Sequence, residues 1–467
     1  MNMYNTNEIL KIRLTAAPPL WAKSSVSILR QTACLEIFEA TLVNDTSVDV
    51  VLHFDNYSEI ANQRYGYGRL GFWFFRFGAH NLNATDAARR AAAAGSALES
   101  SLWAKFPDGS CVCLYQSFGQ LDHFAIWRSV ARTLAKSSYF PARALSRYRR
   151  KGSLVTCIAE DPLIYPSVIA SYLAEMRAIL RKVVNTLFYN EQWIVIVGKE
   201  QNLMPNLNQY QWLLNPPADC FWADPFPIEK DGRIWILLEV LPFTKKQGYL
   251  AAIELLADGS HGEPQTIMTS DKHLSYPFIF SWQDELYLLP ETGKSREVTL
   301  WKCQQFPDRW IKAATLLTDV CFADATLIEH QGLWWLFLTI GEEDGICLQD
   351  ELHLYYATSL FGCWTPHIEN PIKSDARNSR PAGNLFYRNG ELYRPAQDCG
   401  TGYGKAIVLN RINQLDTEGF SETPVARIDA SWHKECTGTH TLSHSKNYWA
   451  LDRKHLLPRW TIFALKV

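Results

Sequence analysis

The C-terminal part of the chain repeats one pattern of apolar and polar positions five times. In each repeat a polar or small residue precedes a short apolar strand, a turn and an aromatic-rich strand, and a second marker residue follows 15 positions after the first. The repeats run from Asp224 to Glu239, Tyr276 to Glu291, Asp324 to Thr339, Ala382 to Gln397 and Thr437 to Asp452. Their starts lie 52, 48, 58 and 55 residues apart, and a period near 50 with strand patterning is typical of β-propeller blades. The pattern therefore predicts an all-β, five-bladed β-propeller.

Two further strand-like segments flank the repeats. Trp193–Val197 precedes the first repeat, and Trp460–Val467 follows the last one. Propellers commonly close by pairing strands from both chain ends in one blade, which removes open sheet edges. We therefore assign residues 193–467 to the propeller and expect both ends to meet in the last blade.

The N-terminal part has a different, mixed pattern. Strands are predicted at Ile9–Leu14 and Val48–Phe54, and helices at Trp21–Thr32 and at Thr85–Ala94, with Gly95 as C-cap. The pattern thus predicts that residues 1–150 form a smaller N-terminal α/β domain. The amphipathic segment Ser171–Tyr189 predicts that residues 151–192 form a helical linker.

Composition narrows the class of protein. The chain of 467 residues is 47% hydrophobic and 20% charged, which suits a globular protein with large cores. A net charge of −2 gives no electrostatic case for nucleic acid as a partner. Eleven scattered cysteines and the lack of an apolar signal core at Met1–Leu14 predict a cytoplasmic protein with reduced thiols. Arg143–Lys151 carries five basic residues, which favour a solvated face and leave peripheral membrane or phosphate contact as the alternative.

Ionisable residues recur where the innermost strand of each repeat begins and where the second strand ends. These positions can ring one mouth of the propeller channel. The candidates are Asp224, Glu239, His273, Glu291, Asp324, Arg380, Gln397, Asp398, His440 and Asp452, with Trp222, Tyr276, Phe322 and Tyr403 beside them. Buried unpaired carboxylates are costly, so these groups either cap strands and pair with Arg380 and Arg394, or flank a sugar as general base and acid. The aromatic residues either stack on a sugar ring or belong to the core.

Several motifs carry a family resemblance. They are Trp222–Phe226, His273–Phe278, Pro290–Thr292, Ser379–Gly383, Tyr393–Asp398 and Tyr403–Gly404. Over residues 210–455 the chain resembles the N-terminal domain family of plant glucosamine inositolphosphorylceramide transferases and their bacterial relatives. That domain is similar in turn to the five-bladed fold of family 43 glycoside hydrolases, in which the first-blade Asp is the general base. The resemblance implies Asp224 as base, Glu291 as acid and Asp324 as a carboxylate that tunes a pKa.

The N-terminal region carries a second resemblance. Asp49–Leu52 and Gly71–Gly78 are similar to a degenerate formyltransferase-like module that precedes this propeller in bacterial relatives. Neither His53 nor His80 lies in an Asn-His-Asp setting, so formyl transfer is not expected.

The leading hypothesis is a carbohydrate-active enzyme that transfers sugars in surface glycan or glycolipid assembly, with its site at the mouth of the channel. His273, Arg380, Arg394 and His440 would bind an activated sugar or an anionic acceptor. No cofactor is expected, and no metal, since no Asp-x-Asp diphosphate signature lies at a strand end. An inverting hydrolase similar to family 43 and a noncatalytic sugar-binding or scaffolding propeller remain open, because fold alone does not separate them.

Overall fold

The computed structural model describes residues 9–32, 34–38, 48–56, 59–78, 82–157, 165–199, 202–245, 247–341 and 347–461. The chain divides into two compact units, Met1–Ile179 and Leu180–Val467. Among the described residues, no helix is long and apolar enough to cross a membrane. His80 lies outside the described residues.

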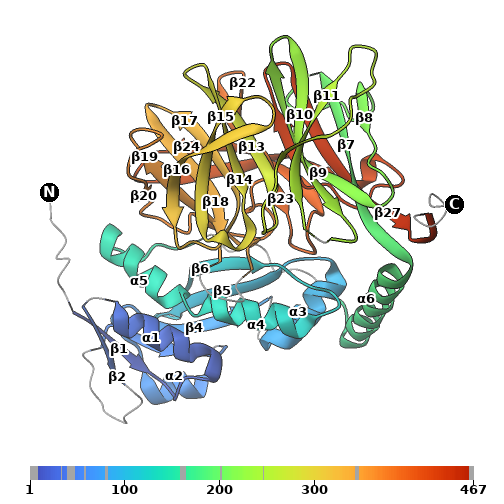
Figure 1. The fold of residues 1–467 in the computed structure, drawn as a ribbon. Helices are drawn as coiled ribbons and strands as arrows, with labels where there is room; N and C mark the ends of the chain where they lie inside the picture. The colour runs from blue at the N-terminus through green and yellow to red at the C-terminus, as the bar shows by residue number, and fades with distance from the viewer. Residues whose placement is uncertain are drawn as a thin grey trace. The chain divides into compact units, whose positions relative to one another are not determined.

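The first unit is an α/β domain, as predicted (Figure 1). Its six-stranded sheet has the order β2-β1-β3-β4-β5-β6. The strands are β1 (Leu10–Leu14), β2 (Leu35–Phe38), β3 (Val50–His53), β4 (Phe72–Phe77), β5 (Leu98–Lys105) and β6 (Cys111–Gly119). The helices are η1 (Leu20–Ala22), α1 (Lys23–Gln31), α2 (Glu59–Tyr65), α3 (Ala84–Ala94), α4 (Ile126–Ser137) and α5 (Phe140–Lys151). The first four strands in this order pair in parallel, and β4, β5 and β6 pair antiparallel.

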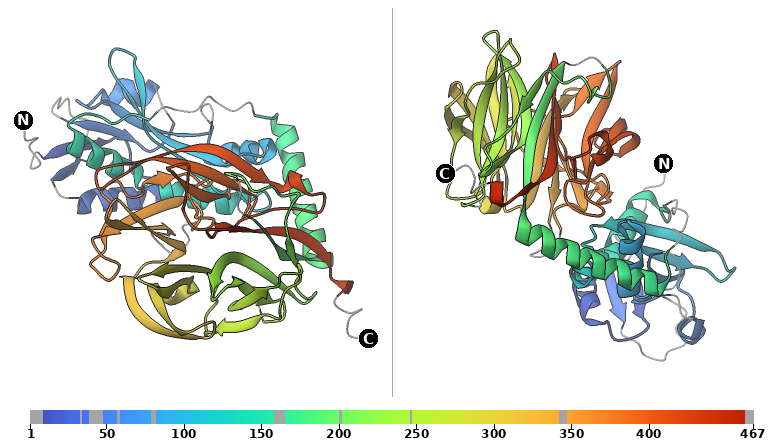
Figure 2. Two further views of the ribbon diagram at one scale, coloured as in Figure 1. Left: turned by 90° about the horizontal axis from the view of Figure 1, so that it is seen from above. Right: turned by 90° about the vertical axis from the view of Figure 1, so that its right-hand side faces the viewer.

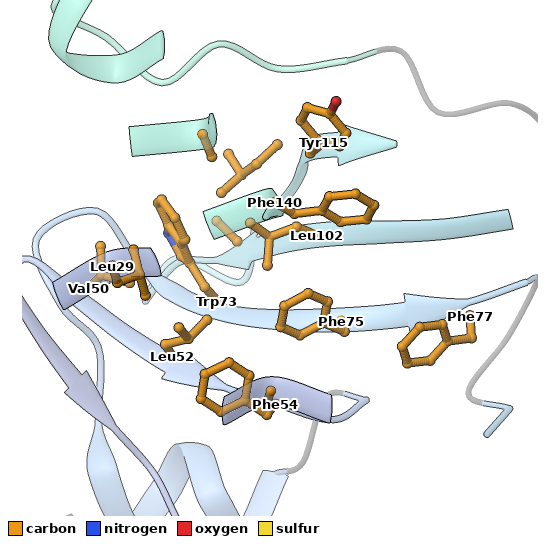
Figure 3. Packing of buried hydrophobic residues seen from close by; sticks show 14 of the residues in the cluster. Leu29, Val50, Leu52, Phe54, Trp73, Phe75, Phe77, Leu102, Tyr115 and Phe140 are labelled. Carbon is orange, nitrogen blue, oxygen red and sulfur yellow. The ribbon is translucent and has the colours of Figure 1, made fainter. Parts of the chain in front are cut away.

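The run of aromatic residues in β4 is explained by burial on both faces of the sheet. Trp73 and Phe75 pack in the main core beside Leu52 (Figure 3). Phe72 and Phe74 pack in a second cluster on the other face of the sheet. Strands buried on both faces read as continuous apolar runs. The pattern at Gly71–Gly78 is therefore accounted for by packing.

The second unit is a five-bladed β-propeller, which confirms the predicted fold class (Figures 1 and 2). Blade one contains β9 (Cys220–Lys230), β10 (Arg233–Pro242), β11 (Tyr249–Leu255) and β12 (Gln265–Met268). Blade two contains β13 (Ser275–Trp282), β14 (Glu285–Glu291), β15 (Glu297–Gln305) and β16 (Arg309–Thr318). Blade three contains β17 (Phe322–His330), β18 (Leu333–Ile340), β19 (Glu351–Ala357), β20 (Thr365–Pro366) and β21 (Lys373–Ser374). Blade four contains β22 (Phe386–Arg388), β23 (Glu391–Asp398), β24 (Ala406–Leu415) and β25 (Phe420–Asp429). The connections include the short helices η2 (Gly293–Ser295) and η3 (Ala430–Trp432).

Blade five is built from both ends of the propeller, as predicted. It contains β26 (Leu442–His444), β27 (Tyr448–Pro458), β7 (Tyr189–Lys199) and β8 (Trp212–Leu214), in this order. β7 follows α6 (Val168–Phe188) and pairs with β27 along its whole length. The predicted strand at Trp460–Val467 was wrong where the structure describes it, because β27 ends at Pro458 and Trp460 is helical. Residues 462–467 lie outside the described residues.

The fifth repeat is aligned differently from its predicted start at Thr437. In blade one, the residue two positions before the second marker pairs with the residue two positions after the first marker. In blade five Ala450, two positions before Asp452, pairs with Ser443. The first marker of this blade is therefore Thr441, because its inner hairpin is shorter than the others.

Three of the first markers lie in β-bulges. Asp224, Tyr276 and Asp324 have φ angles of 52°, 46° and 53°, and the register of the inner hairpin shifts at each of them. A bulged residue leaves the hydrogen-bonding ladder and re-aims its side chain. All three side chains consequently contact another blade: Asp224 reaches Thr441, Tyr276 reaches Thr326, and Asp324 reaches Arg380.

Gly383 allows blades four and five to approach each other closely. Its φ is 126°, and a Cβ built on it would lie 2.0 Å from the backbone oxygen of Leu442. We expect Gly383→Ala to lower the free energy of unfolding by about 3 kcal/mol or more, since backbone strain and a clash add. The matched control is Gly390→Ala, with φ 81° and open space around the new methyl group, which should cost only about 1 kcal/mol. Urea denaturation measures both values, and equal losses would contradict the role of Gly383.

Candidate functional site

A cluster of ionisable side chains lies where the inner strands of the blades meet. It contains Asp224 and Glu239 from blade one, Glu291 from blade two, Asp324 from blade three, Arg380 from the segment before β22, and His440 and Asp452 from blade five. All of these side chains are buried except that of Glu291, which is 13% exposed. Buried charges need partners. The contacts among these groups therefore decide which of them are ionised.

His440 links blade one to blade five through both ring nitrogens. Nε2 lies 3.2 Å from Asp224 Oδ1, and Nδ1 lies 2.8 Å from Asp452 Oδ2. Burial alone would lower the pKa of this imidazole, but the carboxylates of Asp452 and Asp224 raise its pKa to about 10. His440 is thus an imidazolium at neutral pH. Its ring also packs against Trp193, with centroids 4.1 Å apart.

Asp452 fixes the backbone where blade one meets blade five, which we call the His440 junction. Its Oδ1 accepts hydrogen bonds from the backbone N–H groups of His440 (2.9 Å) and Thr441 (3.0 Å). Its Oδ2 accepts one from the N–H of Asp224 at 3.1 Å. A fully buried carboxylate with these donors is a positioning group, because its hydrogen bonds fix two blades in one register.

Asp224 is held as a carboxylate. Its Oδ1 accepts from Thr441 Oγ1 at 2.7 Å, and its Oδ2 accepts from the backbone N–H of Tyr276 at 3.1 Å. Burial would raise the pKa of this carboxyl, yet the charge and hydrogen bond of His440, with Thr441 and Arg380, lower it below its ordinary value. Asp224 is therefore ionised at neutral pH.

Asp324 and Arg380 form the second ion pair of the cluster. Arg380 Nε lies 2.5 Å from Asp324 Oδ2, and Nη2 lies 3.2 Å from Oδ1. Gln397 Nε2 donates to Asp324 Oδ2 at 2.8 Å. The guanidinium also lies 5.0 Å from the ring centroid of Tyr403, a distance that suits a cation–π contact. These two hydrogen bonds fix Arg380 against Asp324, and its Nη2 also lies 3.7 Å from Glu291 Oε2.

The pKa values of Glu239 and Glu291 are both raised. Burial, followed by the charge of Asp224, raises the pKa of Glu239 well above its ordinary value. Burial and the charge of Asp324 raise the pKa of Glu291 to about 8, although Arg380 lowers it. Glu291 Oε2 accepts from the backbone N–H of Asp324 at 3.2 Å and lies 3.7 Å from Arg380 Nη2.

His273 contacts Glu239 as a neutral side chain. The backbone N–H of Gly248 donates to its Nδ1 at 2.9 Å, which leaves the ring proton on Nε2. That nitrogen lies 3.3 Å from Glu239 Oε1, an oxygen without a hydrogen-bond partner among the described residues. Burial lowers the pKa of His273. Glu239 Oε1 is thus a buried oxygen that faces the neutral ring of His273.

The residues of the His440 junction also have the composition of a metal site. One ligand atom from each of Asp224, His440 and Asp452 lies within 4.8 Å of the others. A metal would require an unprotonated ring nitrogen, whereas the pKa of His440 is raised to about 10. The arrangement fits an imidazolium bridge better than a metal centre.

The structure places four other predicted residues outside the cluster or assigns them to packing. Arg394 is fully buried in blade four, where it binds Glu422 at 2.6 and 2.8 Å. Asp398 pairs with Arg427 at 2.5 Å. Trp222 lines a separate pocket of about 520 Å³ that also contains Tyr249 and His261. Tyr276 is fully buried and hydrogen-bonds Thr326 at 2.8 Å and the N–H of Gly383 at 2.9 Å.

Two residues of the site were missed from the sequence. Thr441 lies within the predicted repeat Thr437–Asp452 but was not recognised as its first marker, and only the shortened hairpin of blade five could have revealed it. Trp193 was assigned to a strand, but its contact with His440 needs the closure of the ring. Gly404 makes room for this contact, since a Cβ there would lie 2.8 Å from the Trp193 ring.

Comparisons with solved structures give low overall similarity. The family 43 (GH43_1) enzyme from Xanthomonas citri complexed with xylose is 9% identical and covers 52% of this chain and 88% of that chain, with a TM-score of 0.38. A GH43 β-xylosidase/α-arabinofuranosidase from a compost metagenome is 12% identical, with coverages of 52% and 92% and the same TM-score of 0.38.

Sequence comparisons are more specific. Glucosamine inositolphosphorylceramide transferase 1 of Oryza sativa subsp. japonica is 36% identical over 254 residues, which cover 51% of this chain and 34% of the relative. The protein of the same name from Arabidopsis thaliana is 32% identical over 208 residues, which cover 44% and 27%. The chain thus spans about a third of the length of these relatives. Residues 215–459 include most of the propeller and the cluster of ionisable side chains described above, here called the axial cluster. They match the family described as glucosamine inositolphosphorylceramide transferase 1, N-terminal, and the chain belongs to this family.

Proposed function

We propose that this protein is a glycosyltransferase that uses the axial cluster at the mouth of the propeller channel. The observation that carries the proposal is that the pKa values are shifted in opposite directions: the pKa of Asp224 is lowered, whereas those of Glu239 and Glu291 are raised. Carboxyl groups whose environments push their pKa values apart serve as base and acid in one site. Carboxyl groups that only cap strands would not need pKa values shifted in opposite directions.

Asp224 is the proposed general base. A carboxylate has about four acceptor positions, and Asp224 uses three for Thr441, Tyr276 and His440. The fourth position would accept the proton of an acceptor hydroxyl as that oxygen attacks the anomeric carbon. His440 and Arg380 keep this base charged before the substrate arrives.

Glu291 is the proposed general acid. Its pKa of about 8 keeps the proton at neutral pH while leaving it transferable to the departing oxygen. Asp324 sets this value, because its charge raises the pKa of Glu291, and Arg380 limits the increase. Glu239 and His273 would orient sugar hydroxyl groups beside them, as neutral hydrogen-bonding partners.

The proposed substrate class rests on the names of the relatives, which contain both glucosamine and inositolphosphorylceramide. We propose an activated amino sugar as donor and an inositol phosphate lipid as acceptor. A cytoplasmic location is part of the proposal and is supported by the eleven cysteines, which are all free thiols. Peripheral membrane contact through Arg143–Lys151 would add to acceptor binding. One basic side chain of that segment already has a partner within the protein, since Arg143 Nη1 donates a hydrogen bond to the Tyr115 hydroxyl at 3.1 Å.

Replacing the base gives the first test of the mechanism. We expect Asp224→Asn to lower transfer of glucosamine from a nucleotide-sugar donor to inositolphosphorylceramide vesicles by at least ~100-fold. The matched control is Asp398→Asn, which removes a carboxylate paired outside the cluster and should keep wild-type activity. Circular dichroism of both variants checks folding. Full activity of Asp224→Asn would remove this residue from the mechanism.

The same assay separates the alternatives. Release of free sugar that does not depend on the acceptor would instead indicate an inverting hydrolase similar to family 43. Donor or acceptor binding without turnover would indicate a noncatalytic sugar-binding or scaffolding propeller.

The raised pKa of Glu291 has a consequence for stability. A carboxyl with a folded pKa of about 8 and an ordinary value of 4.5 keeps its proton in the native state while the unfolded chain loses it. The free energy of unfolding should therefore fall as pH rises from about 4.5 to 8, by up to about 1.4 kcal/mol per pH unit. Glu291→Gln does not titrate, so its stability should decline less over this range. Urea denaturation at pH 5, 6, 7 and 8 measures the difference, and parallel curves for both proteins would show that Glu291 is already ionised.

A further inference from the structure

The helix α6 (Val168–Phe188) exposes an unusual amount of apolar surface. Ile169, Met176, Leu180 and Leu187 are 75%, 66%, 64% and 62% exposed. Seven more large apolar residues of this helix are also exposed: Val168, Tyr172, Leu173, Ile179, Val183, Val184 and Phe188. Large contiguous apolar patches mark interaction sites on soluble proteins.

All of these residues except Phe188 share one face of the helix. With 3.6 residues per turn, the apolar positions from Val168 to Leu187 cover an arc of about 160° that contains no charged residue. The four charged side chains, Glu175, Arg177, Arg181 and Lys182, all project from the remaining arc. α6 is therefore strongly amphipathic.

The polar side of α6 is the side that packs. Ser171 is its only buried residue among those described. Glu175 Oε2 accepts from Arg89 Nε of α3 at 2.8 Å. A surface helix of a globular protein normally turns its apolar stripe inward. In α6 the orientation is reversed, which leaves the apolar face available to a partner.

We propose that α6 is an interfacial helix that binds the surface of an anionic lipid bilayer. Its apolar face would enter the boundary between headgroups and acyl chains, and the helix axis would lie in the plane of the membrane. Figure 2 shows α6 as one continuous helix, so the face is presented without interruption.

The charges of α6 favour an anionic surface. Three basic residues against one acidic residue give the helix a net positive charge, and Glu175 is already paired with Arg89. By helical position, Arg177 borders one edge of the apolar arc and Lys182 lies towards the other. Long basic side chains in these places can reach lipid phosphates while their stems lie along the apolar surface.

Aromatic residues at the end of the helix point to the same partner. Next to the C-terminus of α6, Trp460 is 60% exposed beside Tyr189, with ring centroids 6.3 Å apart. Trp and Tyr concentrate at headgroup level because they combine an apolar ring with a polar group. A second copy of the chain would need only the narrow apolar seam of a coiled coil, whereas the arc of α6 is far wider.

The inference is independent of sugar transfer and can be tested on the whole protein. The test is flotation with vesicles of phosphatidylcholine containing 30% phosphatidylglycerol, against vesicles of phosphatidylcholine alone. We expect binding to the mixed vesicles, with weaker binding to neutral vesicles and at 0.5 M salt. Leu180→Glu should weaken binding at least about tenfold, since it replaces a membrane-buried Leu by a charge.

The matched control is Ala170→Glu, which adds the same charge at an exposed position on the polar arc of the same helix. It should bind within about threefold of the wild type, because a charge there stays in water. Met176→Ser, a milder change of the apolar face, replaces Leu180→Glu if that variant does not fold, and it should also weaken binding.

Three results would overturn the proposal. They are wild-type protein that does not float with the anionic vesicles, equal losses in Leu180→Glu and Ala170→Glu, and a vesicle-independent dimer that Leu180→Glu dissociates. Asp224→Asn should bind vesicles like the wild type. A variant that loses sugar transfer but still binds vesicles therefore tests only the catalytic proposal. A variant that loses vesicle binding but keeps sugar transfer tests only the proposed role of α6.

Discussion

The imidazolium of His440 is the interaction on which the centre of the propeller depends. In blade five, β7 and β27 pair along their whole length and so join the two ends of the propeller. The innermost strand of this blade, β26, has only three residues. The inner edge of the closure is instead joined by His440, which lies between Asp224 of blade one and Asp452 of blade five. Removing the imidazolium would leave two buried carboxylates facing each other, so this contact fixes both the ring and its charge.

The protonation of the other groups follows from this bridge. Five carboxyl groups share the cluster with two cations, His440 and Arg380, and burial makes an unpaired carboxylate costly. His440 lies between Asp224 and Asp452, and Arg380 pairs with Asp324. Arg380 lies farther from Glu291, at 3.7 Å, than from Asp324, and the pKa values of Glu239 and Glu291 are both raised. The opposite pKa shifts of the proposed base and the proposed acid thus follow from the small number of cations in the cluster.

The sequence predicted the blades because each one has the same physical requirements. A turn at a fixed position sets the register of the inner hairpin, and the aromatic strand fills the space between neighbouring sheets. The markers Asp224, Glu239, Glu291, Asp324 and Asp452 lie in one cluster for this reason.

The failures also have physical causes. Side chains alternate along a strand, so Asp398 projects away from its neighbour Gln397 and reaches Arg427. Arg394 meets Glu422 of another strand, a pairing that no local pattern reveals. Thr441 was lost because one short hairpin changes the alignment of its repeat. Protonation could not be predicted from sequence, since it depends on burial and on charges from blades far apart in the chain.

A lipid acceptor would connect the axial cluster with the apolar face of α6. A base that is buried and already accepts three hydrogen bonds can act only on a hydroxyl group delivered to its last free position. Soluble acceptors would reach it by diffusion in three dimensions, whereas an inositol phosphate headgroup is confined to the bilayer surface. Holding the enzyme on that surface raises the effective concentration of the headgroup without any new contact at the cluster. Membrane binding would then increase turnover by concentrating the acceptor, and the intrinsic strength of the base would stay as His440 sets it.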